Sequence, residues 1–179
     1  MGRTPEVLLV EDNPGDACLT SNALAREPHP CHITVASDGV RALAVLRDRC
    51  AQGMAPDLVL LDLNLPRKDG RAVLRELKAD PVLRRLVVVV FSTSGAPRDI
   101  ESCYELGANC YVRKPGNLSD FLAAVDAISA LWLGPAYLRG AEKAPEANPS
   151  WAGKADWQNG PENIGEAWAT KLLRRTGRG

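Results

Sequence analysis

Short apolar runs recur along the chain as far as Leu133, and each is followed by a segment whose apolar residues recur at helical spacing. The runs cover residues 7–10, 33–36, 58–61, 86–91 and 110–112. Runs without a polar face are typical of strands that helices cover on both sides of a parallel sheet. The helical segments begin at Pro14, after Gly39, after Gly70, at Pro97 and at Leu118. The alternation predicts an α/β fold, a doubly wound parallel sheet of five strands.

The apolar content of the runs also predicts their places in the sheet. Residues 7–10, 58–61 and 86–91 are the most continuously apolar, so we expect these three strands at the centre. Pro14 and Pro97 each mark a helix start, because proline is favoured at the first helical position. Asn13, directly before Pro14, adds the expectation of a side-chain cap.

The composition changes after the last of these helices, which we expect to end at Trp132. Residues 134–179 are rich in Gly, Pro, Ala and polar residues, which is typical of an extended tail. Within the tail, the helical spacing of apolar residues predicts a short amphipathic helix at 163–175. We therefore divide the chain into a domain at residues 5–133 and a tail at 134–179. The tail holds three tryptophans that we expect to pack on the domain, on a second copy or on a partner, namely Trp151, Trp157 and Trp168.

Charge and cysteine content exclude several classes of protein. With 22 basic and 22 acidic residues the formal net charge is zero, which gives no electrostatic reason to bind nucleic acid or an anionic membrane. The five cysteines are odd in number and form no C-x-x-C pair, so neither a disulfide framework nor a zinc site is indicated. The sequence shows neither a secretory signal nor an apolar stretch long enough to span a bilayer. We expect a cytoplasmic protein without nucleic-acid or membrane partners.

Three carboxylates follow two of the central strands. Glu11 and Asp12 come directly after residues 7–10, and Asp62 comes directly after residues 58–61. The carboxyl ends of parallel strands meet at one edge of the sheet, where ligands bind in folds of this class. If the two strands are neighbours, the repulsion between the carboxylates must be relieved by protonation or by a cation. Mg²⁺ prefers such oxygen ligands, so we expect it as the cofactor.

The other strand ends contribute a hydroxyl and an amine. Ser92 follows residues 86–91, and Lys114 follows the last strand, just before Pro115. A phosphoryl group transferred to Asp62 needs a divalent ion, a positive side chain and a hydrogen-bond donor around its oxygens. This set therefore predicts that Asp62 is a nucleophile towards phosphorus. Taken singly, Asp62 could instead cap a helix and Lys114 could be a solvated lysine; the combination favours the phosphoryl site.

The ordered set Glu11-Asp12, Asp62, Ser92 and Lys114-Pro115 resembles the receiver domain of two-component response regulators over about residues 5–133. The resemblance implies a flavodoxin-like, CheY-like fold in which Asp62 is the phosphoacceptor. It also implies that Glu11, Asp12, Asp62 and the backbone carbonyl of Asn64 hold Mg²⁺, and that Lys114 contacts the phosphoryl group. Ser92 would be the switch hydroxyl and Tyr111 the aromatic switch residue. Such a protein signals through protein contacts and hydrolyses its own phosphoaspartate slowly, rather than turning over an external substrate.

Three stretches are similar to the single-domain regulators that pair with phytochrome-type sensor histidine kinases: "VEDNPGDACLT", "LDLNLPRKDG" and "CYELGANCYVRKP". This closer resemblance implies a sensor histidine kinase as the partner, with a bacteriophytochrome as the candidate, and formation of a homodimer. A basic cluster, Arg67, Lys68 and Arg71, follows Asp62. Such clusters are usually solvated, and the alternative is that this one steers a kinase surface.

An aspartate-nucleophile phosphatase of the haloacid dehalogenase type is the main alternative function. That chemistry requires a second acid two residues after the nucleophile, where this chain has Asn64, whose amide cannot act as a general acid. A flavodoxin-like FMN carrier would not place three carboxylates at its phosphate loop. A P-loop NTPase is excluded by the absence of a G-x-x-x-x-G-K-[ST] run.

Overall fold

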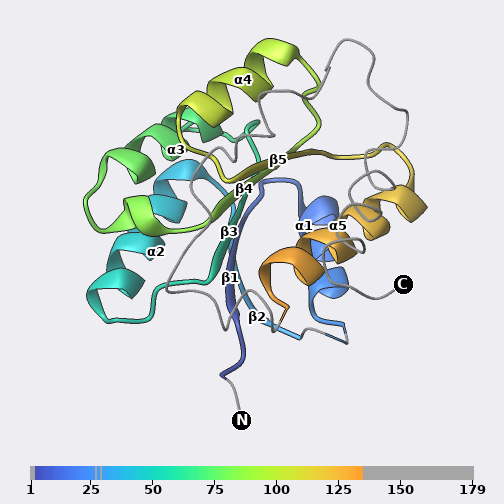
Figure 1. Ribbon diagram of the computed structural model, residues 1–179, viewed down its shortest axis with the longest axis horizontal. Coiled ribbons are helices and arrows are strands. Elements are labelled where there is room, and N and C mark those ends of the chain that lie inside the picture. Colours follow the sequence, from blue (N-terminus) through green and yellow to red (C-terminus); the bar gives the residue numbers. More distant parts are fainter. Residues whose placement is uncertain (1–2, 27, 29, 135–179) are drawn as a thin grey trace, which may run out of the picture.

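The computed structural model describes residues 3–26, 28 and 30–134, and within them five parallel strands form one sheet in the order β2-β1-β3-β4-β5 (Figure 1). The strands are β1 (Glu6–Val10), β2 (His32–Ala36), β3 (Leu58–Leu61), β4 (Val88–Ser92) and β5 (Cys110–Arg113). The helices are α1 (Pro14–Leu24), α2 (Gly39–Ala51), α3 (Gly70–Ala79), α4 (Pro97–Glu105) and α5 (Leu118–Trp132), with a short 3₁₀ turn η1 (Leu83–Arg85) before β4.

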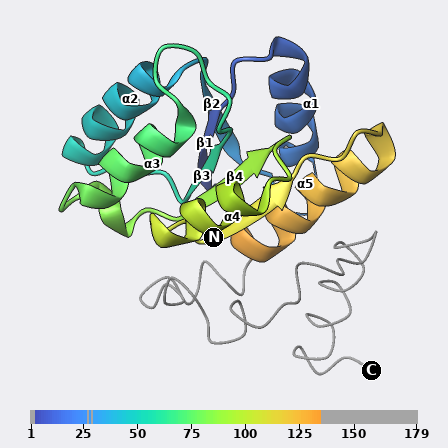
Figure 2. The same ribbon diagram turned by 90° about the horizontal axis from the view of Figure 1, so that it is seen from above.

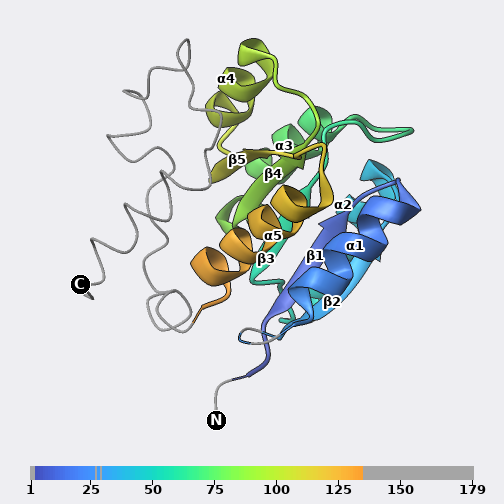
Figure 3. The same ribbon diagram turned by 90° about the vertical axis from the view of Figure 1, so that its right-hand side faces the viewer.

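Helices cover both faces of the sheet. Figure 2 shows α2, α3 and α4 on one face and α1 and α5 on the other, and Figure 3 shows α1 and α5 running side by side. Successive residues of a strand point to opposite faces, so Leu8 and Val10 pack under α2 and α3 while Val7 and Leu9 pack under α1 and α5. All four residues of β3 are buried, as an interior strand of a two-sided sheet requires.

The predicted alternation and the central places of β1, β3 and β4 are confirmed. The largest difference is in β4, which the sequence predicts at residues 86–91 and which spans Val88–Ser92. Leu86 is outside the strand because its amide donates to the carbonyl of Leu83 and closes the η1 turn. The predicted tail helix at 163–175 and the three tail tryptophans lie outside the described residues.

No helix in the described part of the chain is both long enough and apolar enough to cross a bilayer.

The helix starts fix the loops at the carboxyl edge of the sheet. The Asn13 side chain accepts hydrogen bonds from the amides of Gly15 and Asp16, and Pro14 is the first residue of α1, as predicted. The side chains of Asp38, Asp69 and Asn117 cap α2, α3 and α5 in the same way, whereas α4 starts at Pro97 without a side-chain cap.

At the start of α3, a Cβ on Gly70 would overlap the backbone carbonyl oxygen of Asp62, so only glycine fits there. The start of α3 therefore packs directly against the backbone of Asp62, the residue that follows β3.

At the opposite edge of the sheet, Lys78 on α3 gives a pH-dependent prediction. Its Nζ donates to the carbonyls of Leu86 (2.9 Å) and Arg84 (3.3 Å) and to Asn109 Oδ1 (3.4 Å), and burial lowers its pKa to about 8. Since the unfolded chain holds this proton up to a pKa of 10.5, we expect stability from Lys78 to rise between pH 8 and 10.5 and to be lost as pH falls through 8.

Lys78→Met should remove that rise. As pH rises from 8 to 10.5, we expect the unfolding free energy of wild type to increase by roughly 1 to 2 kcal/mol relative to that of the variant. This value allows for the partial hydration of Lys78. Urea titrations at closely spaced pH values measure the difference directly. A constant difference across the range would show that the folded-state pKa of Lys78 is ordinary.

Candidate functional site

An acidic cluster lies where β1 and β3 end. Val10 and Leu61 are register partners in these adjacent strands, so the residues that follow them meet at the same edge of the sheet. One carboxylate oxygen from each of Glu11, Asp12 and Asp62 lies within 4.8 Å of the others. Glu11 and Asp62 are buried and Asp12 is exposed, so the cluster has one open side. This arrangement can hold a hard divalent cation.

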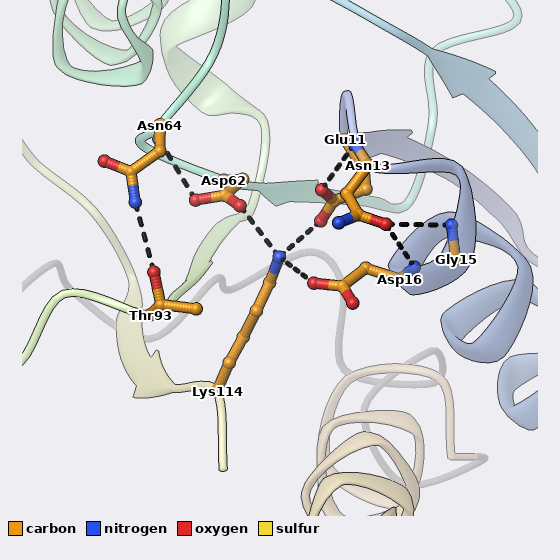
Figure 4. A network of polar contacts seen from close by, with 8 residues as sticks. All are labelled: Glu11, Asn13, Gly15, Asp16, Asp62, Asn64, Thr93 and Lys114. Carbon is orange, nitrogen blue, oxygen red and sulfur yellow. Dashed lines mark hydrogen bonds and ion pairs between the residues drawn. The ribbon is translucent and has the colours of Figure 1, made fainter. Parts of the chain in front are cut away.

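Lys114 reaches the cluster from the end of β5 (Figure 4). Its Nζ donates to Glu11 Oε2 at 2.5 Å, to Asp62 Oδ2 at 2.7 Å and to Asp16 Oδ2 at 2.9 Å. The amide of Lys114 donates to the Ser92 carbonyl, and Nζ lies 5.8 Å from the centre of the Phe91 ring, so β4 supports the long side chain. The Lys114 side chain is only 3% exposed, which means that its charge is balanced by these carboxylates rather than by water.

Burial and charge pairing act against each other at this site. Burial raises the pKa of Glu11, and its hydrogen bond and ion pair with Lys114 only partly offset that rise. Burial alone would lower the pKa of Lys114, but its hydrogen bonds to Asp62, Glu11 and Asp16 outweigh burial and raise that pKa. The ammonium therefore stays charged throughout the physiological range. A fixed positive charge next to Asp62 suits a reaction in which negative charge builds up there.

The loop after β3 is folded around Asp62. The amide of Asn64 donates to Asp62 Oδ1 at 3.1 Å, and the Asn64 side chain donates to Thr93 Oγ1 at 3.2 Å. The amide of Asp62 itself donates to the Val10 carbonyl at 3.0 Å. The Asp62 carboxylate is thereby oriented by one backbone donor on Oδ1 and by Lys114 on Oδ2.

Ser92 and Tyr111 lie beside this site on β4 and β5. Ser92 is fully buried, and its Oγ makes no hydrogen bond within the described part of the chain. A buried hydroxyl without a partner is unfavourable, so this oxygen is free to donate to a group that arrives nearby. Tyr111 is half-buried and its hydroxyl donates to the Ser94 carbonyl at 2.8 Å, which ties β5 to the loop after β4.

Two contacts at the site were not expected from the sequence. Asp16 is a third anion on Lys114, although the predicted start of α1 at the same edge could have indicated it. Thr93 bonds Asn64, a pairing between two loops that no sequence pattern reveals. The basic cluster is neutralised within the molecule: Arg67 pairs with Asp38, Lys68 with Glu76, and Arg71 with Asp69 and Asp99.

Comparison with known proteins identifies the family of this chain. Residues 7–126 match the family model of the response regulator receiver domain. Response regulator Rcp1 of Synechocystis sp. is 41% identical over 129 residues, which cover 71% of this chain and 88% of Rcp1. The family match supports a receiver over the haloacid dehalogenase alternative.

Solved structures show the same similarity. The phosphorylated cyanobacterial phytochrome response regulator RcpA aligns with a TM-score of 0.69 and 46% identity, covering 73% of this chain and 95% of RcpA. The Mn²⁺-bound form of Rcp1 aligns with a TM-score of 0.67 and 40% identity, covering 73% of this chain and 96% of that one. With its sheet order, its acidic cluster and these matches, the chain belongs to the response regulator receiver family and has the CheY-like fold.

Proposed function

We propose that this receiver takes a phosphoryl group onto Asp62 from the phosphohistidine of a sensor kinase, in a reaction that requires Mg²⁺. The contact that carries the proposal is the triple hydrogen bond of Lys114 Nζ to the buried carboxylates of Asp62 and Glu11 and to the partly exposed carboxylate of Asp16. In the transfer, an Asp62 oxygen forms a bond to phosphorus as the bond from phosphorus to the histidine nitrogen breaks. The leaving imidazole remains on the kinase.

The residues around Asp62 suit this step. Glu11, Asp12, Asp62 and the backbone carbonyl of Asn64 are our proposed ligands for Mg²⁺, which would neutralise charge on the phosphoryl oxygens. Their fit to a divalent ion rests on the convergent oxygens of the acidic cluster and on its exposed side at Asp12. Lys114 already donates to Asp62 Oδ2 and would pass that hydrogen bond to a phosphoryl oxygen.

We propose that Ser92 and Tyr111 transmit the change. The unpartnered hydroxyl of Ser92 would gain an acceptor in the phosphoryl group, which favours movement of the end of β4 towards Asp62. The Ser94 carbonyl belongs to the loop that follows, so this movement would strain its hydrogen bond with Tyr111. Release of Tyr111 would alter the surface beside α4 and β5. The protein would thus act as a signalling switch rather than as an enzyme with an external substrate.

The proposed kinase partner is of the phytochrome type. The support is the similarity to RcpA, named as a phytochrome response regulator, and to Rcp1. We further propose that output proceeds through protein contacts in the cytoplasm, including a homodimer. The resemblance to single-domain regulators of phytochrome-type kinases supports the homodimer, and a net charge of zero gives no electrostatic reason to expect nucleic acid as a partner.

Dependence on the metal tests the proposal. With Mg²⁺ present, we expect the full chain to take up label from a phytochrome-type kinase or from acetyl phosphate, and chelation with EDTA should reduce the label to background. Phosphorylated kinase alone, treated with EDTA, shows whether the chelator affects the donor. Equal labelling with and without Mg²⁺ would contradict the proposed role of the acidic cluster.

A further inference from the structure

The loop between β3 and α3 is held at two points by the start of α2. The guanidinium of Arg67 pairs with the Asp38 carboxylate at 2.5 Å. One residue further along each segment, a Cβ on Gly39 would lie 2.5 Å from the carbonyl oxygen of Lys68, so the backbones meet with no room for a side chain. The loop that leaves Asp62 is thus docked on a neighbouring loop at the same edge of the sheet.

Arg67 has an unfavourable backbone conformation. Its φ is 63°, and no other non-glycine residue in the described ranges has a positive φ. Glycine adopts this conformation without steric cost, whereas a Cβ makes it unfavourable. The Arg67 side chain is 68% exposed, and its ion pair among the described residues is with the buried carboxylate of Asp38.

Asp38 is a partner that is held in place on both carboxylate oxygens. Its side chain is 1% exposed, and Oδ1 is fixed by the amide of Arg41 while Oδ2 receives Arg67. Asp38 follows β2, whose last residue, Ala36, accepts a hydrogen bond from the amide of Glu11 at 2.9 Å. The ion pair therefore connects the neighbourhood of Glu11 with the loop that starts at Asp62.

Arg67 and Asn64 belong to one closed arch of backbone. The amide of Gly70 donates to the Leu63 carbonyl at 2.9 Å and closes the arch, and the amide of Lys68 donates to the Pro66 carbonyl within it. Since Gly70 also packs against the backbone of Asp62, the base of the arch cannot move freely. Asn64 is held on its own side of the arch by Asp62 and Thr93, and the ion pair of Arg67 with Asp38 anchors the opposite side of the same loop.

We infer that Arg67 is a positioning residue, whose ion pair with Asp38 fixes this arch and thereby sets the affinity of the carboxylate site for divalent cations. The inference rests on the proposed function in one respect: it assumes that Asn64 supplies a ligand to the ion. It goes further by assigning control of the affinity to a residue that does not touch the ion. Residues that hydrogen-bond directly to metal ligands commonly change metal affinity by about tenfold or more, and Arg67 acts one contact further out, so we expect a smaller change.

The test measures the affinity for Mg²⁺ alone in wild type, Arg67→Gln, Arg67→Gly and Arg67→Lys, by NMR titration of the full chain. We expect the Gln and Gly variants to bind Mg²⁺ roughly threefold to tenfold more weakly than wild type, and the Lys variant to recover part of the loss. The Gly variant keeps the positive φ without strain, so a loss that the Gln and Gly variants share points to the missing side chain rather than to backbone strain. Phosphorylation at saturating Mg²⁺ should reach the wild-type level in all variants.

Arg75→Gln is the matched control, because Arg75 is exposed on α3 and forms no ion pair with any described residue. Both Gln variants lose one positive charge, which by long-range attraction alone would strengthen cation binding slightly. Weaker binding in Arg67→Gln but not in Arg75→Gln supports positioning. Unchanged or tighter binding in Arg67→Gln overturns it while leaving the proposed function intact, whereas a wild type that binds no Mg²⁺ contradicts the proposed function itself.

Discussion

We expect the Asp62→Asn variant to lose phosphorylation by acetyl phosphate and by a sensor kinase. The amide is not a nucleophile towards phosphorus, and the substitution also removes one of the three charges of the acidic cluster. The rate should fall by at least roughly a thousandfold, since removal of a nucleophile costs more than this in well-studied enzymes. Initial rates of label incorporation with Mg²⁺ measure the effect.

Beryllofluoride gives a second measurement on the same variant. This phosphoryl mimic, added with Mg²⁺, should shift the amide resonances of Ser92 and Tyr111 in wild type but not in Asp62→Asn. Asp48→Asn is a suitable control because Asp48 is an exposed carboxylate on α2. If the Asp62→Asn variant took up label with wild-type stoichiometry, the assignment of the phosphoacceptor would be contradicted.

The second large effect is expected on stability, from Lys114→Gln. Glu11 and Asp62 have side chains that are 2% and 6% exposed, and without the ammonium they would be two buried like charges. Removing one partner of a buried ion pair costs about 3 kcal/mol or more. We therefore expect the free energy of unfolding at neutral pH to fall by about that amount in the absence of divalent ions.

Two dependences identify the cause of this loss. Added Mg²⁺ should restore part of the stability, since the ion replaces the missing charge, and the deficit should shrink as pH falls and the Glu11 carboxyl, whose pKa is already raised by burial, takes up a proton. In wild type the contribution of Lys114 to stability is fully present at neutral pH and is lost only above the usual lysine pKa of 10.5, because the pKa of Lys114 in the folded protein is raised.

Asp16→Asn, which removes the more exposed partner of Lys114, should lower the free energy of unfolding much less. A deficit independent of both Mg²⁺ and pH would mean that lost packing, not charge, is responsible.

Much of the fold and of the site could be predicted from the sequence because both follow from strand ends. The run Leu58–Leu61 favoured a central strand, and parallel neighbours then bring Glu11, Asp12 and Asp62 together. The position of Lys114 next to Asp62 required only that the last strand lie in the same sheet.

The contacts between loops could not be predicted from the sequence. The bonds of Arg67 to Asp38 and of Asn64 to Thr93 join residues 29 positions apart, and no periodicity encodes such a meeting. The strand predicted at 86–91 begins too early because Leu86 and Val87 are as apolar as the strand itself, while the hydrogen bond from the Leu86 amide to the Leu83 carbonyl keeps Leu86 in the η1 turn. The predictions for the tail and for the homodimer remain predictions.

The most direct test of the account is to locate the phosphoryl group. Borohydride reduces an aspartyl phosphate to homoserine, so wild-type protein phosphorylated with Mg²⁺ and acetyl phosphate can be reduced, digested and sequenced by mass spectrometry. We expect homoserine at position 62 and at no other aspartate, and none when EDTA replaces Mg²⁺. An intact Asp62, with homoserine at a different aspartate or with a stable phosphate on another side chain, would contradict it.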